Sequence, residues 1–169
     1  MSHWTEIDSP IGPLLIEGDG DTVSSLQMRN QRYSRPRTSD LVRDNGRFSG
    51  IAEQMAEYFA GTRTEFGFGI EFLRGDEFQR RVWRGLLEIP YGETWSYKQL
   101  AEHVGLDASD SRAVGSANAR NPIAIAVPCH RVIGADGSLT GYAGGLEKKA
   151  FLLDLEAGRP RLDGFDAAG

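Results

Sequence analysis

Short apolar runs alternate with turn sequences in the first thirty residues, which is the pattern of a small antiparallel sheet. The runs lie at 4–7, 14–16 and 23–28, and the turns at 9–13 and 18–21. Proline and glycine in these turns favour chain reversal, so we expect a three-stranded meander. Residues 30–47 are polar and rich in arginine and are expected to form a loop, and residues 66–70 are expected to add one strand.

From residue 48 onward the spacing of apolar residues changes to that of helices. One amphipathic helix is predicted from Phe48 to a stop at Gly61, and another from the N-cap Asp76 to Leu86. A last helix is predicted from about Leu146 to Glu156. The residues expected on its buried face are Leu146, Ala150 and Leu153. We expect Glu156 at its end to be solvated unless it folds back onto His130.

Two short helices joined by a glycine-containing turn are predicted in the back half of the chain. Ser96 and Gln99 form a capping box that opens the first helix, and Gly105 ends it. Ser109 or Asp110 caps the second helix, which runs to about 119. Such a pair is the pattern of a helix-turn-helix, although helix pairs also occur in many proteins that do not bind DNA.

The second helix of this pair consists almost entirely of small residues from Arg112 to Ala119. Glycine inside a helix costs roughly 1 kcal/mol relative to alanine, so its presence calls for a reason. Either the helix packs tightly against a neighbour or it enters a narrow groove with Arg112 leading. It offers few of the side chains that read bases, so we expect DNA binding with little sequence preference.

Charge and composition set limits on function. The net charge is −5, and residues 1–71 hold 7 Lys and Arg against 11 Asp and Glu, whereas residues 110–150 hold 5 against 3. The mild basic excess therefore surrounds the single cysteine, and few phosphate contacts are expected. The start of the chain does not resemble a signal peptide and no apolar run could span a bilayer, so we expect a cytoplasmic protein without a membrane partner.

Metals and nucleotides are not expected as ligands. One cysteine excludes an internal disulfide and a cysteine-rich zinc site, and His3, His103 and His130 do not have the spacing of metal ligands. The glycine-rich loop at 139–145 lacks the Gly-Lys-Ser/Thr ending of a phosphate-binding loop. We therefore expect no cofactor and no metal.

Cys129 follows a continuous apolar run, and two interpretations of it stand side by side. A cysteine beside a buried run is by default an inert core residue. Its neighbours favour a nucleophile instead, because Pro128 fixes the backbone, His130 can act as a base and Arg131 adds positive charge that favours thiolate. Asn121 can hold the turn through bonds to the backbone.

The sequence around Cys129 resembles the O6-alkylguanine-DNA alkyltransferases, in particular the bacterial single-function form. The matching blocks cover roughly residues 72–156, together with one at the front of the chain. They are Ser9–Leu14, Phe78–Trp83, Ile89–Thr94, Ser96–Tyr97, Arg112–Gly115, Asn121–Ile123, Val127–Val132 and Gly141–Leu146.

The resemblance implies an α+β fold with two domains. Residues 1–71 are expected to form a ribonuclease-H-like domain with a small antiparallel sheet and a helix. Residues 72–169 are expected to form a mainly helical, winged-helix-like domain that carries the helix-turn-helix, binds DNA and transfers the alkyl group. The structural zinc of some relatives is not expected here, because the cysteines that hold it are missing.

The resemblance also implies a partner, double-stranded DNA with an alkylated guanine, and a base that is flipped out of the stack. The helix from Arg112 would enter the minor groove, and Arg112 would fill the vacated stack. Tyr97 would crowd the neighbouring phosphate and protonate guanine N3. The other residues expected to contact DNA are Ala113, Gly115, Ser116 and Ala119.

By the same resemblance, Cys129 attacks the alkyl carbon of O6-alkylguanine, or of O4-alkylthymine, and is consumed in one event. His130, Glu156 and a water would relay the thiol proton away, and Asn121 would act as a hinge. The residues expected to bind the base are Pro128, Val132, Tyr142 and Ala143. A monomer is expected in solution, with assembly on DNA left open.

Three other functions remain to be distinguished. A binding-only relative that flags lesions lacks the cysteine in this motif, so Cys129 argues against that class. A helix-turn-helix regulator with an inert cysteine and a cysteine hydrolase are the other two. A hydrolase needs a third group that orients its histidine base, and none is evident from the sequence.

Overall fold

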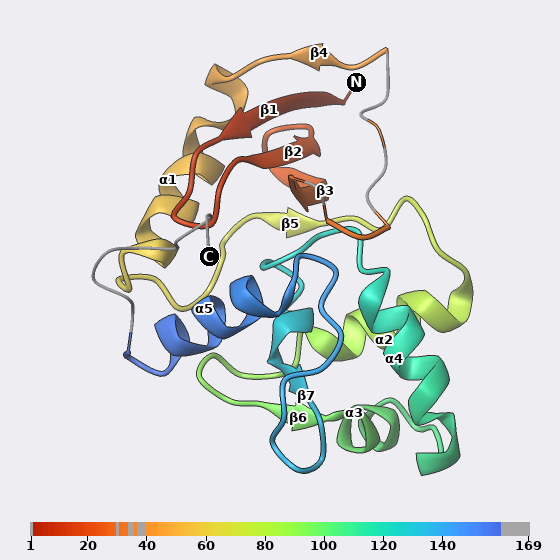
Figure 1. Cartoon of the computed structure of the whole chain (residues 1–169). Coiled ribbons are helices and arrows are strands. Elements are labelled where there is room, and N and C mark those ends of the chain that lie inside the picture. The colour runs from red at the N-terminus through yellow and green to blue at the C-terminus, as the bar shows by residue number, and fades with distance from the viewer. Residues whose placement is uncertain (1, 30, 34–35, 37–39, 160–169) are drawn as a thin grey trace.

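The front half of the chain forms a five-stranded sheet, seen at the top of Figure 1. The computed structural model describes residues 2–29, 31–33, 36 and 40–159. The strands are β1 (His3–Ile7), β2 (Leu14–Gly18), β3 (Thr22–Met28), β4 (Val42–Arg43) and β5 (Gly69–Ile70). Their order is β4-β1-β2-β3-β5. The central three strands are antiparallel, and the short edge strands β4 and β5 pair in parallel with β1 and β3.

The predicted meander and the extra strand near residue 70 are confirmed. The prediction of a loop over 30–47 is only partly right, and residues 30, 34–35 and 37–39 of it lie outside the described residues. Within it the structure has strand β4 and, at its end, the 3-10 helix η1 (Gly46–Phe48). Sequence periodicity could not find β4, because a two-residue strand with Val42 55% exposed has no buried face to mark it.

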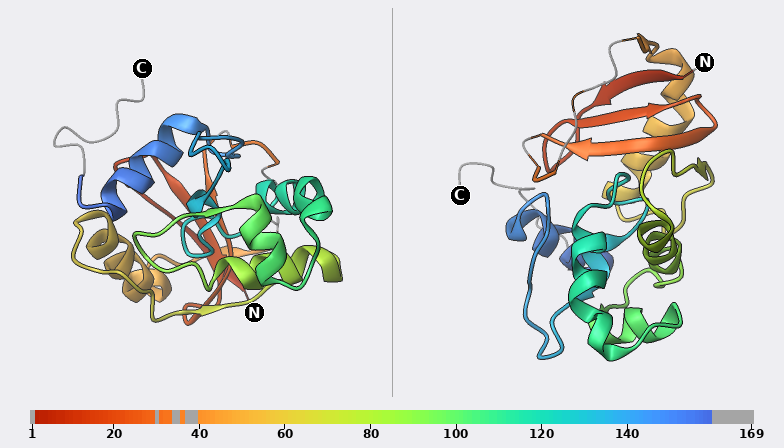
Figure 2. Two further views of the ribbon diagram at one scale, coloured as in Figure 1. Left: turned by 90° about the horizontal axis from the view of Figure 1, so that it is seen from below. Right: turned by 90° about the vertical axis from the view of Figure 1, so that its right-hand side faces the viewer.

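Helix α1 (Ser49–Phe59) packs against one face of the sheet, as the two views in Figure 2 show. Its buried residues Ile51, Met55 and Tyr58 follow the predicted helical spacing. Gly61 lies just beyond its end with φ +79°, a backbone conformation that glycine adopts without strain. The amphipathic pattern therefore located this helix correctly at both ends.

The back half is built from helices and one short strand pair. The helices are α2 (Glu77–Leu86), α3 (Tyr97–His103), η2 (Ala108–Asp110), α4 (Ser111–Ala119), η3 (Cys129–Arg131) and α5 (Leu146–Glu156), and the strands are β6 (Trp95–Ser96) and β7 (Val132–Ile133). The predicted N-cap Asp76 of α2 and the predicted capping box of α3 are both present, and Asp76 forms a capping box with Gln79 as well. The α+β fold class inferred from the sequence is confirmed.

The start of α4 differs from the prediction. Neither Ser109 nor Asp110 caps it through a side chain, because a 3-10 turn, η2, leads directly into the helix. The Asp110 carboxylate instead accepts a hydrogen bond from the amide of Asp107 at 3.0 Å. The two helices α3 and α4 are thus joined by Gly105, which has φ +80°, and by one extra turn.

The buried face of α5 is not the predicted one. Leu146 is 47% exposed, whereas the buried residues are Lys149, Phe151, Leu152, Leu155 and Glu156. The sequence of this helix carries apolar residues on two sides, so periodicity alone does not select one. Tertiary contacts select the face that includes the two charged residues: Glu156 pairs with His130 and Arg131 of η3, and Lys149 donates to the carbonyls of Val132 and Thr140.

The two halves meet along strand β3 and share one continuous core. The segment that follows α4 lies beside β3: the Leu26 amide donates to Pro122 O at 3.0 Å, and the Ala124 amide donates to Leu26 O at 3.0 Å. This junction fixes the chain seven residues before Cys129. No helix in the described part of the chain is long and apolar enough to cross a membrane.

Candidate active site

Helix α4 has one side that packs on the protein and one side that is open. Val114, Ala117 and Asn118 are buried, whereas Arg112, Ala113 and Ser116 are exposed and Ala119 is half-buried. Trp83 anchors the packed side through its indole nitrogen, which donates to Ala117 O at 2.8 Å. Tight packing therefore accounts for the small residues on one side of the helix, and the other side is open, as entry into a groove would require.

Gly115 brings α4 close to Tyr97 at the start of α3. A Cβ atom on Gly115 would lie 3.6 Å from the Tyr97 ring. The Tyr97 hydroxyl donates to Thr140 O at 3.3 Å, in the segment that leads to the glycine-rich loop. Tyr97 is half-buried and lies between α4 and this loop, where it can contact a molecule bound to either.

The turn from α4 to Cys129 is held by Asn121, as the sequence predicted. Its side-chain amide donates to Val127 O at 2.7 Å and to Ile123 O at 3.3 Å, and its oxygen accepts from the Ile123 amide at 3.0 Å. Ile125 within the turn has φ +70°, a strained conformation for a β-branched residue. The Asn121 bonds keep the backbone in this shape, and Pro128 then starts the short helix η3.

Cys129 is the first residue of η3 and is 6% exposed. Burial raises the pKa of its thiol, and a hydrogen bond from Asn121 and the charge of Lys149 act in the opposite direction. The resting side chain is therefore a neutral thiol, and forming the thiolate requires a base nearby.

Lys149, on α5, is the buried cation of the site, and sequence reasoning missed it. It is fully buried, and its Nζ donates to Val132 O at 2.5 Å and to Thr140 O at 2.7 Å. Burial lowers its pKa to about 8, although the charge of Cys129 acts to raise it. A signal was available, because Lys149 stands seven residues before Glu156 and the two share one helix face.

We expect Lys149→Met to raise the thiol pKa of Cys129. The substitution keeps the length of the side chain and removes the only cation that lowers that pKa in the described structure. The pH profile of the rate of alkylation by iodoacetamide would shift to higher pH. Lys148→Met, at the half-buried neighbouring lysine, is the control, and a shift of equal size in both variants would contradict this role for Lys149.

His130 and Glu156 form a buried pair, which is the second of the two expectations for Glu156. His130 Nε2 lies 2.7 Å from Glu156 Oε2, and both residues are almost fully buried. Burial lowers the pKa of His130, and the nearby Glu156 charge opposes this. A neutral imidazole that donates through Nε2 presents Nδ1 as an acceptor, and Nδ1 has no partner among the described residues.

Arg131 does not act on the thiol as the sequence predicted. Its Nε donates to Glu156 Oε1 at 2.7 Å, and its Nη1 donates to Ile89 O at 2.7 Å. The guanidinium charge of Arg131 therefore pairs with Glu156, which lies 25 residues away along the chain. Although burial alone raises the pKa of Glu156, His130 and Arg131 outweigh it, so the pKa lies well below its usual range.

Tyr58 is a second residue that the sequence did not point to. It comes from α1, in the front half of the chain, and its hydroxyl donates to Glu156 Oε2 at 2.6 Å. Burial and the Glu156 charge raise the pKa of Tyr58, so the phenol keeps its proton. Glu156 therefore collects donors from both halves of the molecule. Sequence spacing gave no signal for this contact, because Tyr58 and Glu156 lie 98 residues apart along the chain.

The glycine-rich loop forms another wall of the site. Tyr142 is close enough to Cys129 for their charges to interact, and its buried hydroxyl has no partner among the described residues. The Ala143 carbonyl accepts from the amide of Arg32 at 2.7 Å, so the front half braces the loop. The Ala143 amide has no acceptor in the described part of the chain, and it is free to bind a ligand oxygen.

The predicted residues thus fall into two groups. The first group carries the thiol, surrounds it or holds the elements that surround it, and consists of Cys129, His130, Glu156, Asn121, Pro128, Val132, Tyr142 and Ala143. Arg112, Ala113 and Ser116 lie on the open side of α4, and Tyr97 stands between the groups. In the described residues, no group of three or more His, Cys, Asp or Glu could hold a metal. A buried thiol beside a neutral histidine is suited to nucleophilic attack.

Comparison with known proteins gives matches over nearly the whole chain. Residues 2–72 match the family described as "6-O-methylguanine DNA methyltransferase, ribonuclease-like domain", and residues 77–158 match "6-O-methylguanine DNA methyltransferase, DNA binding domain". The methylated-DNA–protein-cysteine methyltransferase of Mycobacterium tuberculosis is 52% identical over 163 residues, which cover 96% of this chain and 97% of that protein.

More distant relatives and solved structures agree. The methylated-DNA–protein-cysteine methyltransferase of Methanosarcina acetivorans is 45% identical over 154 residues, covering 91% of this chain and 97% of that protein. A crystal structure of Mycobacterium tuberculosis OGT in complex with DNA superposes with a TM-score of 0.89 at 51% identity, over 95% of this chain and 96% of that one.

Proposed function

The chain belongs to the 6-O-methylguanine DNA methyltransferase family, and we propose that it repairs DNA by moving the alkyl group of O6-alkylguanine onto Cys129. The observation that carries this is the buried thiol of the single cysteine, whose neighbour in the chain, His130, is a buried base paired with Glu156. Double-stranded DNA is the partner, and the reaction is direct-reversal repair by a methylated-DNA–protein-cysteine methyltransferase.

The transfer is a displacement at carbon. The Cys129 sulfur forms a bond to the alkyl carbon, the bond from that carbon to guanine O6 breaks, and guanine leaves with the electron pair. Proton donation to the ring makes guanine a better leaving group, a general-acid role that we assign to Tyr97. The product is a thioether, which water does not readily cleave, so each molecule reacts once.

The proton of the thiol leaves through His130. Nδ1 takes the proton, directly or through one water, and Nε2 keeps its own proton on the bond to Glu156. The negative charge of Glu156 stabilises the imidazolium that forms, and Glu156 stays ionised because Arg131 and Tyr58 donate to it. The positive charge of Lys149 favours the thiolate as it forms. Asn121 keeps Cys129 in position relative to this relay.

The damaged base reaches the thiol by leaving the duplex, because its O6 atom is inaccessible inside the stack. We assign Arg112 to the vacated space, with Ala113, Gly115, Ser116 and Ala119 along the minor groove. The Ala143 amide meets guanine O6, and Tyr142 and Pro128 line the alkyl slot. The carbonyls of Val132 and Cys129 accept from the guanine amino group through the lone pairs that Lys149 and Asn118 leave available.

The same site accepts O4-alkylthymine, whose alkyl group is attached to the equivalent oxygen.

We place the protein in the cytoplasm, where a reducing medium keeps the single thiol free. It works as a monomer, and residues 1–71 and 72–169 are its two domains.

The test is an intact-mass measurement. The protein is incubated with a duplex that contains one O6-methylguanine, and we expect the mass to rise by one methyl group, mapped to Cys129 by peptide analysis. A second addition of substrate should transfer nothing more. Unchanged mass with tight lesion binding would indicate a binding-only sensor, and repeated turnover would indicate a hydrolase.

A further inference from the structure

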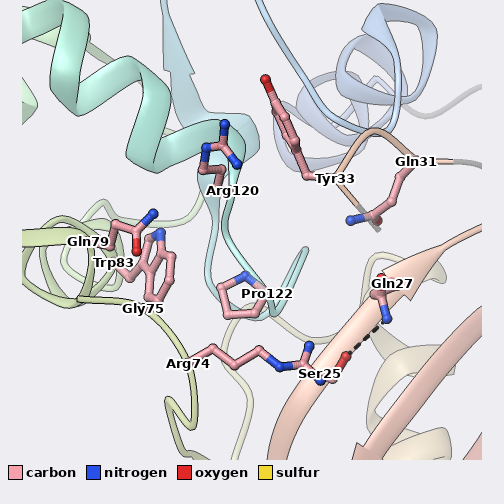
Figure 3. A pocket seen from close by; sticks show the side chains of 10 residues that line it. All are labelled: Ser25, Gln27, Gln31, Tyr33, Arg74, Gly75, Gln79, Trp83, Arg120 and Pro122. Atoms are coloured by element: carbon pink, nitrogen blue, oxygen red, sulfur yellow. Dashed lines mark hydrogen bonds between the residues drawn. The ribbon is translucent and has the colours of Figure 1, made fainter. Parts of the chain in front are cut away.

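A small pocket lined by hydrogen-bond donors lies where the two halves of the molecule meet (Figure 3). Its volume is about 100 Å³, and it lies between strand β3, the start of α2 and the end of α4. The polar side chains that line it are Ser25, Gln27, Gln31, Arg74, Gln79 and Arg120. None of the described residues around it is Asp or Glu, so two guanidinium groups face a cavity without a carboxylate.

Two of the glutamines are fixed with their donor ends toward the cavity. Gln31 Oε1 accepts from the Met28 amide at 2.7 Å, and Gln79 Oε1 accepts from the Asp76 amide at 3.0 Å. Since each oxygen is held by the backbone, the NH₂ group must point the other way, and both are seen beside the cavity in Figure 3. The cavity thus presents donors from two amides and two guanidinium groups.

Arg120 is held by an aromatic ring. Its guanidinium lies 4.2 Å from the centroid of Tyr33, and the guanidinium of Arg32 lies 5.0 Å from the same ring. Stacking uses the face of a guanidinium and leaves the N–H groups on its edge free to donate. Arg32, Arg74 and Arg120 have no carboxylate partner among the described residues. Arg32 and Arg120 carry like charges on the same ring, and such an arrangement becomes favourable when an anion binds beside them.

Arg120 also lies on the open side of α4. Residues 112, 113, 116 and 120 recur with helical spacing and all four are exposed. Eight residues separate Arg112 from Arg120, which is about 12 Å along a helix axis. A duplex that follows this side of α4 from Arg112 therefore reaches the pocket at the other end.

We propose that this pocket binds a phosphate of the DNA backbone, so that the front half of the chain, through Tyr33, Gln31 and β3, contributes to holding the duplex. The inference rests on the proposed function, in which α4 lies along the DNA. Its ligand is a phosphate group held by Arg74, Arg120 and the two amides, distinct from the extruded base at Cys129.

The experiment measures the binding of an undamaged duplex against salt concentration for Arg120→Ala and Arg74→Ala. Loss of one phosphate contact lowers the slope of log K against log salt by about 0.9. We expect that change in each variant, with weaker binding at low salt. Arg43→Ala, which removes an exposed arginine from edge strand β4, is the matched control and should leave the slope unchanged. Unchanged slopes in Arg120→Ala and Arg74→Ala, or an equal change in Arg43→Ala, would overturn the proposal.

Two further measurements distinguish a DNA phosphate site from a free-anion site, and a failure of this proposal from a failure of the proposed function. Inorganic phosphate that raises the melting temperature of the wild type but not of Arg120→Ala, with unchanged duplex slopes, would show a free-anion site and overturn the assignment to DNA. Transfer from free O6-alkylguanine reports on folding and on the thiol in each variant. If the wild type fails in that reaction while the slopes still respond, the proposed function is wrong and the phosphate site stands.

Discussion

Cys129→Ser is expected to abolish alkyl transfer while leaving DNA binding intact. A serine hydroxyl is nearly the size of the thiol but does not ionise in this range, and the relay from His130 to Glu156 is matched to a thiol. The chain has no other cysteine that could accept the group. We therefore expect no methyl addition in intact mass after incubation with a methylated duplex.

DNA binding is the control for this variant, because Cys129 lies in the core and the open side of α4 does not depend on it. The affinity of Cys129→Ser for the same duplex should stay within about twofold of the wild type, which is less than 0.5 kcal/mol. Loss of both transfer and binding would show that the cysteine is structural, and the inert-core interpretation would then be correct.

Glu156→Gln is expected to lower both stability and the rate of transfer. It leaves Arg131 buried without a counter-charge, and breaking a buried pair in this way costs about 3–5 kcal/mol in the free energy of unfolding. It also removes the charge that stabilises protonated His130, so transfer should slow by about 100-fold or more. Denaturant unfolding and single-turnover transfer to Cys129 measure the two effects.

The effect on stability should depend on pH with a defined sign. The pKa of Glu156 is lowered in the folded protein, so its contribution is fully present above about pH 4.3, where an unfolded glutamate titrates, and is lost as pH falls below that. The stability difference between wild type and Glu156→Gln should therefore shrink in acid. Glu147→Gln, on the exposed side of α5, is the control and should change neither quantity. A difference that grows in acid would contradict the ion pair.

Tyr58 connects the front half of the chain to the proposed site in the back half. Its hydroxyl and the two Arg131 nitrogens hold the same carboxylate that orients His130. The Arg32 amide braces the loop with Ala143 in the same way. The sheet and α1 thus set the position of two walls of the site, although the residues that react all come from the other half.

Local patterns in the sequence were sufficient for most elements. The meander, α1, α2 and the helix pair were predicted because capping boxes, turn glycines and apolar spacing act over a few residues. The motif around Cys129 was specific enough to identify the family and its chemistry. Asn121 could also be assigned from the sequence, because its partners lie within six residues of it along the chain.

Contacts between distant segments could not be read in this way. Glu156 was left with two alternatives and Arg131 was assigned to the wrong partner, because the pair spans 25 residues and forms only when α5 packs on η3. Lys149 and Tyr58 were not identified as site residues, because their contacts also form only when α5 packs in the folded chain.

The chemistry of Cys129 depends both on local sequence and on contacts between distant segments. The sequence by itself indicated Cys129 as the acceptor that we propose and determined that Asn121 holds its turn, since these depend on residue types and short spacings. Only the tertiary structure decided its charge state, because the pKa of a buried thiol depends on what surrounds it. Burial raises that pKa, Lys149 opposes it from α5, and the base His130 is oriented by Glu156, which Tyr58 holds from the other half.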